Sequence, residues 1–315
     1  MMPTSTIDLS VSLAPGLRCK NPILTASGTF GYGLEYAPYG NLADLGGMVV
    51  KGLSLKPRKG NPTPRIAECA CGMLNAVGLQ NDGVEAFLKH KLPKLPWRET
   101  AVIANLYATA PEEFAELADL LSAEEGVAAL EVNISCPNVR EGGIAFGQDP
   151  AMAASVTQAV KRAARSTPVI VKLSPNVTDI ASIAQAVEAA GADALTCINT
   201  LSAMSVDLKT RKPLLANVIG GLSGPAIKPV ALRCVWQVSR ATRIPVIGVG
   251  GIASVEDVLE FILVGAHAVQ AGTMNFSRPD FAFRLAEELP LACKRLGIDD
   301  LAAFRASLRI ERRLS

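Results

Sequence analysis

The chain has 315 residues, of which 49% are hydrophobic and 19% are charged, enough apolar surface for a sizeable core in one large or two ordinary domains. Lys plus Arg number 31 against 29 Asp plus Glu, and this balance gives no reason to expect a nucleic acid or an anionic membrane as a partner. Aromatic residues make up only 5% of the chain, so no stacking platform for single-stranded nucleic acid is expected either.

The cysteines point to a reducing compartment. There are seven of them, spread without a framework spacing and with no signal peptide, so we expect a cytoplasmic protein. Cys69 and Cys71 are two residues apart, which is a poor spacing for metal ligands, and no metal site is predicted. The longest apolar run, residues 258–274, is interrupted by Glu260, His267 and Gln270, so no membrane span is predicted.

Short apolar runs and helical patterns alternate along the chain. A hairpin is expected first, over residues 8–13 and 17–19 around Ala14-Pro15-Gly16. Eight predicted strands follow, at residues 23–26, 47–51, 102–106, 129–134, 169–173, 194–199, 246–250 and 268–271. Helical periodicity lies between them, at residues 111–121, 150–165, 180–190, 225–240, 255–264 and 279–296. Near-continuous apolar strands with helices between them indicate a parallel sheet, and eight such units close a barrel. We therefore predict an α/β fold, a (β/α)8 TIM barrel, as a single domain over residues 1–315.

The segment after the second predicted strand fits the barrel pattern least well. Residues 52–79 are rich in Pro and Gly and show hardly any helical periodicity. A loop this long in a compact domain is usually functional or disordered, and in a barrel its position places it over the catalytic end of the strands. We predict an active-site loop that acts as a lid.

Polar side chains end most of the predicted strands. The carboxyl ends of barrel strands converge on the active face, so residues there are candidates for chemistry. They are Lys51 after strand two, Asn105 after strand three, Asn133 with Ser135 and Cys136 after strand four, Lys172 after strand five, and Asn199 with Thr200 after strand six. Any one of these could be an ordinary surface residue, but a set at five successive ends favours a binding site.

The last two strands end in glycines that suit a phosphate. Strand seven ends in Gly248-Val249-Gly250-Gly251 before a helix capped by Ser254, and strand eight ends in Gly272-Thr273. Glycine there lets backbone N–H groups approach a phosphate, the helix N-terminus is expected to add a favourable dipole, and Ser223-Gly224 could supply further donors. A phosphate at one side of the mouth and a lysine at the other suit FMN, because a lysine stabilises the negative charge of a reduced flavin. No GxGxxG motif follows a strand, so a dinucleotide on this chain is not expected.

The remaining half of the mouth is rich in amides. Asn75, Asn133, Asn138 and Asn199 match the edge of a neutral, planar lactam ring, and Lys51 can hold a carboxylate. Asn81, beside glycine, is expected to serve a turn instead.

Cys136 is the candidate base. A thiol with a pKa of about 8.5 is only slightly ionised at neutral pH, yet it can remove a proton made acidic by an adjacent carbonyl. A covalent nucleophile and a structural cysteine remain alternatives. His90 is expected in solvent and His267 at the opposite end of the barrel, so a Cys–His pair is disfavoured.

Several motifs resemble a known family. The stretches NISCPNVREGGIAFGQDP, GMLNAVGLQN and NVIGGLSGPAIKP, with GVGGI and AGT near the C-terminus, are similar to those of the dihydroorotate dehydrogenases over essentially the whole barrel. Within the family they look most like the NAD-linked, two-subunit branch, class 1B. The sequence departs from the family pattern at two places. Cys69-Ala70-Cys71 stands where the family typically has other small residues, and Ala203 stands where glycine is expected.

The resemblance implies an activity and a set of site residues. It implies oxidation of (S)-dihydroorotate to orotate in pyrimidine (UMP) biosynthesis, with Cys136 of NxSCPN as the base that takes the C5 proton while hydride passes from C6 to FMN. It implies pyrimidine contacts from Lys51, Asn75, Ala76, Val77, Gly78, Leu79, Asn133, Asn199 and Thr200. It implies FMN contacts from Ser27, Lys51, Gly52, Asn105, Asn133, Lys172, Ile198, Gly224, Gly250, Gly251, Gly272 and Thr273.

The resemblance also implies partners. A second subunit would carry FAD and a [2Fe-2S] cluster and pass electrons to NAD, and a homodimer within a heterotetramer is expected. Two alternatives stay open: a pyrimidine-reducing flavoprotein related to the barrel of dihydropyrimidine dehydrogenase, and a non-catalytic barrel subunit.

Overall fold

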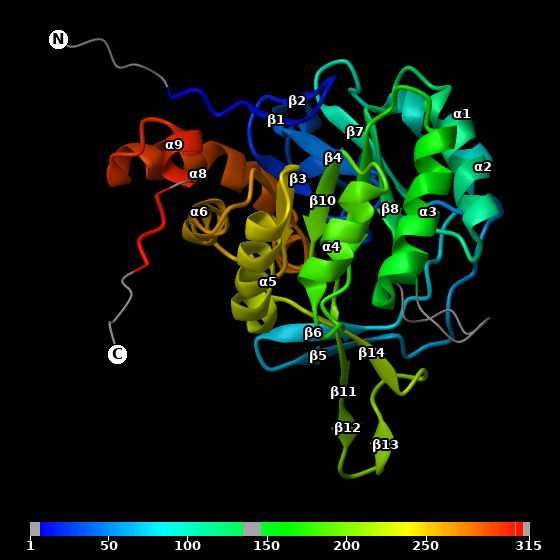
Figure 1. Cartoon of the computed structure of the whole chain (residues 1–315). Coiled ribbons are helices and arrows are strands. Elements are labelled where there is room, and N and C mark those ends of the chain that lie inside the picture. The colour runs from blue at the N-terminus through cyan, green and yellow to red at the C-terminus, as the bar shows by residue number, and fades with distance from the viewer. Residues whose placement is uncertain (1–6, 135–145, 306, 311–315) are drawn as a thin grey trace.

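The centre of the computed structural model is a closed barrel of eight parallel strands (Figure 1). The structure describes residues 7–134, 146–305 and 307–310. The barrel strands are, in spatial order, β3 (Ile23–Thr25), β4 (Gly47–Val49), β7 (Ala101–Leu106), β8 (Ala129–Asn133), β9 (Val169–Leu173), β10 (Ala194–Cys197), β15 (Val246–Val249) and β16 (Ala268–Ala271). All eight predicted strands are present, most of them one or two residues shorter than predicted, and the barrel prediction is confirmed.

Helices cover the outside of the barrel (Figure 1). The six predicted ones are α2 (Pro111–Ser122), α3 (Pro150–Ala163), α4 (Ile180–Ala189), α5 (Lys228–Ala241), α6 (Val255–Leu263) and α8 (Phe281–Leu296). The helix expected from residue 225 starts as a 3-10 turn, η5 (Pro225–Ile227), and becomes α-helical at Lys228. Shorter helices are α1 (Val84–His90), α7 (Met274–Ser277), α9 (Leu301–Arg305), η1 (Leu34–Tyr39), η2 (Leu42–Asp44), η3 (Leu92–Lys94) and η4 (Phe146–Gln148).

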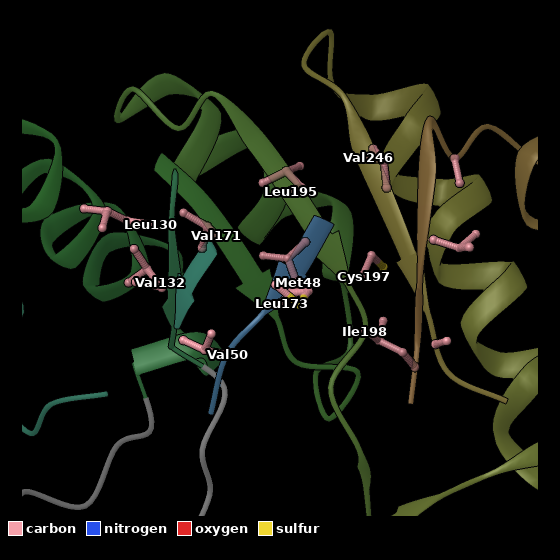
Figure 2. Packing of buried hydrophobic residues seen from close by; sticks show 14 of the residues in the cluster. Met48, Val50, Leu130, Val132, Val171, Leu173, Leu195, Cys197, Ile198 and Val246 are labelled. Carbon is pink, nitrogen blue, oxygen red and sulfur yellow. The ribbon is translucent and has the colours of Figure 1, made fainter. Parts of the chain in front are cut away.

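Two layers of apolar side chains hold the barrel together. One residue from each strand joins an inner cluster, which consists of Leu24, Val49, Ile103, Ala129, Ile170, Ala194, Ile247 and Ala268. The predicted N-terminal hairpin, β1 (Val11–Ala14) with β2 (Leu17–Cys19), adds Leu13 and Leu17 to that cluster, so it plugs the N-terminal end. Alternate strand residues such as Leu130 and Val171 belong to the larger cluster that packs under the helices (Figure 2).

The segment after β4 is built into a sheet. Its strands β5 (Ile66–Cys69) and β6 (Gly72–Asn75) form an antiparallel hairpin. This hairpin pairs with β14 (Ile219–Ser223), which pairs with β11 (Leu201–Met204), both from the segment after β10. We call these four strands the mouth sheet; it lies across the C-terminal ends of the barrel strands (Figure 1). Beyond it, β12 (Val206–Asp207) and β13 (Lys212–Pro213) extend the hairpin that contains β11.

The segment predicted as an active-site loop after strand two does lie at the C-terminal ends of the barrel strands (Figure 1). It is not a loop throughout, because it contains β5 and β6. The sheet depends on glycines: a Cβ on Gly72 would collide with the carbonyl oxygen of Ser223, and one on Gly221 with the hydroxyl of Thr200. Strands that need glycine carry little of the alternating apolar pattern from which strands are predicted. In the described part of the chain, no helix is long and apolar enough to cross a bilayer.

Candidate active site

A cavity opens at the C-terminal ends of the barrel strands, and each of the eight strands or the turn behind it contributes to its wall. The contributing residues include Ser27 after β3, Lys51 after β4, Asn105 in β7, Asn133 in β8, Lys172 in β9, Asn199 after β10, Gly250 after β15 and Gln270 in β16. The mouth sheet forms the remaining wall with Ile66, Met73, Asn75, Gly221 and Ser223. Glycine turns, amide side chains and two lysines are thus gathered in one place.

Most of the predicted site residues line this cavity. They are Ser27, Lys51, Gly52, Asn75, Val77, Gly78, Leu79, Asn105, Asn133, Lys172, Ile198, Asn199, Thr200, Gly224, Gly250, Gly251, Gly272 and Thr273. Ala76 is not among the lining residues, since it is buried with Leu74 and Leu215 in a small core of the mouth sheet. Cys136 lies outside the described residues, as do Ser135 and Asn138.

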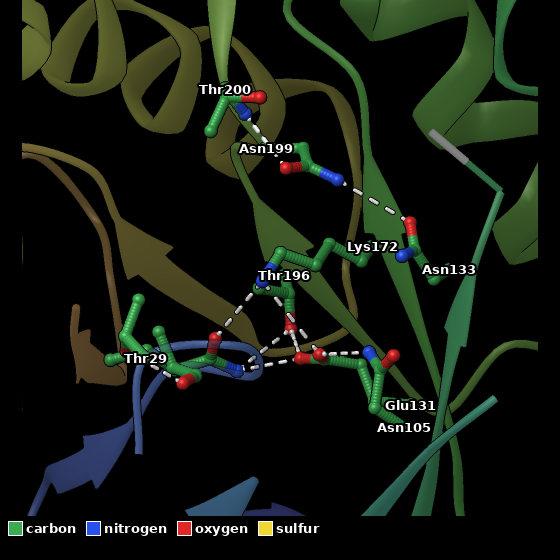
Figure 3. A network of polar contacts seen from close by, with 10 residues as sticks. Thr29, Asn105, Glu131, Asn133, Lys172, Thr196, Asn199 and Thr200 are labelled. Atoms are coloured by element: carbon green, nitrogen blue, oxygen red, sulfur yellow. Dashed lines mark hydrogen bonds and ion pairs between the residues drawn. The ribbon is translucent and has the colours of Figure 1, made fainter. Parts of the chain in front are cut away.

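A buried carboxylate lies at the floor of the cavity (Figure 3). Glu131 of β8 is fully buried. Its Oε1 accepts a hydrogen bond from Asn105 Nδ2 at 2.8 Å, and its Oε2 accepts from Thr196 Oγ1 at 2.7 Å and from Gln270 Nε2 at 2.6 Å. Lys172 Nζ lies 3.8 Å from Glu131 Oε1 and 3.5 Å from Gln270 Oε1.

This network is what the sequence reasoning missed. Glu131 and Gln270 stand in otherwise apolar strand segments, and a charged residue at such a position is itself a signal, because it is almost never fully buried unless paired. The signal could have been read from the sequence, but the three hydrogen-bond partners of the carboxylate could not.

Asn105 leaves a polar atom for a ligand. Its side chain is 1% exposed, its Nδ2 is committed to Glu131, and its Oδ1 finds no partner within the described residues. Gly52 stands against it, since a Cβ there would lie 3.0 Å from Asn105 Oδ1. Buried acceptors are rarely left unpaired, so this oxygen fits a donor on a bound group.

Amide side chains in the cavity order one another. Asn199 Nδ2 donates to Asn133 Oδ1 at 3.3 Å, and the backbone N–H of Thr200 donates to Asn199 Oδ1 at 2.8 Å (Figure 3). Asn176, after β9, fixes the same turn by donating to the carbonyl oxygen of Thr200 at 3.0 Å. From the mouth sheet, Asn75 Nδ2 donates to the carbonyl oxygen of Gly221 at 3.4 Å.

Lys51 is a cation in the cavity wall. Its ammonium group makes no hydrogen bond or ion pair within residues 7–134 and 146–305 of the structure. Burial lowers its pKa below the usual 10.5, and Arg65 lowers it further, whereas Glu35 and Asp82 act in the opposite direction. An anionic ligand beside Lys51 would offset that cost, so this position suits a carboxylate.

The glycine turns after β15 and β16 form the proposed phosphate end. Gly250 and Gly251 have φ angles of 125° and 80°, and a Cβ on Gly251 would lie 2.6 Å from the backbone nitrogen of Lys228. Among the described residues, no acceptor is found for the backbone N–H groups of Gly251 and Thr273. These donors are available to a phosphate.

The N-terminus of α6 is capped by its own side chains. Asp257 Oδ2 accepts from the N–H groups of Ala253 and Ser254 at 2.7 and 2.9 Å, and Ser254 Oγ accepts from the N–H of Asp257. The helix is capped by its own side chains, and Lys228 Nζ, 2.6 Å from Asp257 Oδ1, neutralises the carboxylate. The N–H groups of Ala253, Ser254 and Asp257 are therefore already used, and the favourable dipole expected from this helix at a bound phosphate stays a prediction.

Asn81 and the two histidines lie where the sequence indicated. Asn81 accepts from the N–H of Gly83 at 2.8 Å and donates to Ser54 Oγ at 2.8 Å, so it holds a turn. Neither His90 nor His267 lines the cavity. In the described part of the chain, no group of His, Cys, Asp and Glu residues is arranged to hold a metal ion.

Comparison with known proteins gives one family. The family model described as dihydroorotate dehydrogenase matches residues 9–292. A relative from Solidesulfovibrio magneticus, the catalytic subunit of dihydroorotate dehydrogenase B (NAD(+)), is 72% identical over 305 residues, which cover 97% of this chain and 99% of the relative. The relative of the same description from Maridesulfovibrio salexigens is 64% identical over 304 residues, covering 96% and 99%.

A solved structure shares the fold. It is the crystal structure of DHODH from Eimeria tenella in complex with ferulenol, with a TM-score of 0.77 and 22% sequence identity, covering 96% of this chain and 89% of that one. At this identity the likeness supports the barrel alone.

Proposed function

Since the chain belongs to the dihydroorotate dehydrogenase family, we propose that its cavity binds FMN and dihydroorotate side by side. The activity is the oxidation of dihydroorotate to orotate in pyrimidine biosynthesis, and it is of the NAD-linked type. The observation that carries this conclusion is the 72% identity, over 97% of the chain, to a relative named for that activity.

FMN fits the residues of the barrel half of the cavity. Lys172 offers a buried positive charge, and Asn105 Oδ1 offers a buried acceptor for a ring N–H. The turns at Gly250-Gly251 and Gly272-Thr273, with Gly224 opposite, offer backbone donors to the phosphate. Further contacts are proposed from Ser27, Lys51, Gly52, Asn133 and Ile198. When bound, FMN supplies the acceptor for the hydride lost by the substrate.

Dihydroorotate is assigned to the half of the cavity under the mouth sheet. Lys51 binds the carboxylate, and the side chains of Asn75, Asn133, Asn199 and Thr200 orient the ring through its amide edges. The wall from Val77 to Leu79 excludes water from the reacting face. Ala76, buried in the core of the mouth sheet, is left a supporting role rather than a direct side-chain contact.

Cys136 is proposed as the general base. It follows Asn133, a residue of the cavity wall, by three positions in the sequence. Its thiolate takes the proton from C5 as the hydride leaves C6, so that the ring gains its double bond. General-base catalysis of this kind contributes about 10²- to 10⁴-fold.

The electron acceptor requires a second protein. The relatives are named catalytic subunits, and we propose that this chain, a single FMN-binding domain, pairs with a subunit that carries FAD and a [2Fe-2S] cluster. A homodimer of barrels within a heterotetramer, located in the cytoplasm, completes the proposal.

The test is anaerobic mixing of the purified flavoprotein with dihydroorotate. The wild-type flavin should bleach, and the bleaching rate should rise with pH toward the thiol pKa. A Cys136→Ala variant should bleach about 10²- to 10⁴-fold more slowly. Cys71→Ala is the matched control, since Cys71 is an exposed thiol on the β5–β6 turn, and it should bleach at the wild-type rate. If Cys136→Ala bleached at the wild-type rate, the assignment of Cys136 as the base would be wrong. If the purified protein took up no FMN, the proposed flavin site would be wrong.

A further inference from the structure

Glu131 is a fully buried carboxylate that the proposed reaction does not use directly. It does not line the cavity, and it lies one step below the wall, between Asn105, Thr196 and Gln270. Burying a carboxylate costs free energy unless hydrogen bonds and an opposite charge compensate it. Apolar residues of similar size often fill such a position with equal or greater stability, so stability alone does not account for Glu131.

The hydrogen bonds of Glu131 leave N–H donors of Lys172 for the cavity, although one reaches Gln270 Oε1 at 3.5 Å. Three neutral donors, from β7, β10 and β16, occupy both carboxylate oxygens at 2.6 to 2.8 Å. The ammonium group of Lys172 stands 3.8 Å away, which is too far for a hydrogen bond but close enough for a strong attraction in a buried place. The carboxylate therefore restrains the ammonium group by charge without using up its N–H donors.

The arrangement also neutralises the only buried cation on the cavity floor among the described residues. The side chain of Lys172 is 7% exposed and that of Glu131 is 0% exposed, so solvent screens their charges little. A ligand above Lys172 is exposed to the field of the pair, in which the carboxylate offsets part of the positive charge.

We propose that Glu131 is a positioning residue that holds the Lys172 ammonium group at the flavin and lowers the potential of the bound FMN by offsetting its charge. The inference rests on the proposed FMN site. Because a reduced flavin gains negative charge at its pyrimidine edge, an uncompensated Lys172 would favour reduction more strongly. The pair keeps the potential lower, which favours passing the electrons on toward NAD.

The test is the two-electron midpoint potential of FMN in the purified holoprotein, measured by spectroelectrochemistry. Glu131→Gln keeps the shape of the side chain and removes its charge. We expect at least a tenfold shift of the reduction equilibrium toward reduced FMN, which corresponds to a rise of about 30 mV for a two-electron couple. Thr196→Val is the matched control, because it removes one buried hydrogen bond from the same carboxylate and keeps the charge; its potential should stay within a threefold shift of wild type.

A Lys172→Gln background shows whether Glu131 acts through the lysine. There, Glu131→Gln should shift the reduction equilibrium less than threefold. If Glu131→Gln retains no FMN, four apoproteins are compared by urea unfolding: wild type, Glu131→Gln, Lys172→Gln and the double variant. Glu131→Gln should then reduce the folding equilibrium constant at least tenfold more with Lys172 present than with Gln at that position. If wild type binds FMN but the potential of Glu131→Gln is unchanged or lower, the inference about Glu131 is overturned and the proposed function stands. In the apoprotein comparison, an equal loss of the folding equilibrium constant with Lys172 and with Gln at that position also overturns the inference. A wild-type protein that binds no FMN overturns the proposed function.

Discussion

Lys51 and Lys172 are two lysines at strand ends in one cavity, and their surroundings divide their tasks. Lys172 has a carboxylate 3.8 Å away, whereas the ammonium group of Lys51 has no ion-pair partner within the described residues. The first is suited to tune a bound flavin, and the second is suited to attract an anion from solution.

Orotate affinity should depend on pH through Lys51. Its pKa is lowered from 10.5 mainly by burial, and only the ammonium form attracts the carboxylate, so affinity should fall as pH rises toward a midpoint below 10.5. In a Cys136→Ala background, which removes the titrating thiol, Lys51→Gln should weaken orotate binding about 10- to 100-fold at pH 7, the scale of a charged hydrogen bond. It should also flatten the profile from pH 7 to 10.

Lys56→Gln is the control for this titration, since Lys56 is an exposed lysine outside the cavity. It should leave both affinity and profile unchanged. A pH profile that survives in Lys51→Gln would contradict the assignment of the carboxylate to Lys51.

The Gly251 turn should not tolerate a side chain. Gly251→Ala places a Cβ 2.6 Å from the backbone nitrogen of Lys228 at a φ of 80°, so both FMN retention and stability should fall. Gly16→Ala is matched in φ, at 79°, but its Cβ meets nothing within 4 Å, so it should cost only about 1 to 2 kcal/mol of backbone strain. FMN content after gel filtration and thermal unfolding would compare them, and equal behaviour would refute the close packing.

In the first turn of α6, one carboxylate, that of Asp257, makes most of the stabilising contacts. Asp257 is 11% exposed in its side chain and binds two backbone N–H groups and Lys228. Glu256, the preceding residue, makes an exposed ion pair with Arg295. The two residues share the helix dipole but differ in their contacts, so they form a natural comparison.

Asp257→Ala should lower the free energy of unfolding by about 2 to 3 kcal/mol, because two partly buried N–H donors and a lysine lose their partner. Glu256→Ala should cost less than about 1 kcal/mol, as is usual for surface pairs. Urea denaturation at neutral pH measures both. Equal losses would show that the capping network contributes little beyond the helix dipole.

Elements with a regular pattern were predictable, and elements formed by long-range pairing were not. The run Val169–Leu173 is apolar at each position except Lys172, and strand β9 has these same bounds. The mouth sheet was not predicted. Its glycines, Gly72, Gly220 and Gly221, allow close approach to other segments of the chain, and the local sequence does not show which segments will meet. In the site, Lys51, Asn133 and Lys172 were predictable because strand ends converge. Glu131 was missed because its meaning depends on three partners from other strands.

His267 links the stability of the barrel to pH. Burial lowers its pKa from 6.5 to about 4 in the folded protein, and Arg305 lowers it as well. Between these two values the unfolded chain binds a proton that the folded chain does not. Stability is therefore complete above pH 6.5 and declines as pH falls to about 4, by roughly 2 to 3 kcal/mol.

His267→Gln should reduce this decline, measured as unfolding free energy in urea at pH 7, 5.5 and 4.5. His90→Gln is the control, because His90 is the other histidine of the chain and is exposed. The wild type and the His90 variant should share one slope. If the slope of His267→Gln were the same as theirs, carboxylates and not His267 would govern the acid response.

The mouth sheet has a consequence for the order of folding. Its central pairing joins Leu74 to Leu222, and the hydrogen bond from Asn75 to Gly221 spans 146 residues. Contacts so distant in sequence carry a high cost of loop closure and form slowly. During synthesis the β5–β6 hairpin must wait for four of the eight barrel strands, β7 to β10, before its partner strand exists. The substrate half of the cavity is thus completed among the last steps, after β7 to β10 have been made, and a nascent or truncated chain that ends before β14 has no complete site.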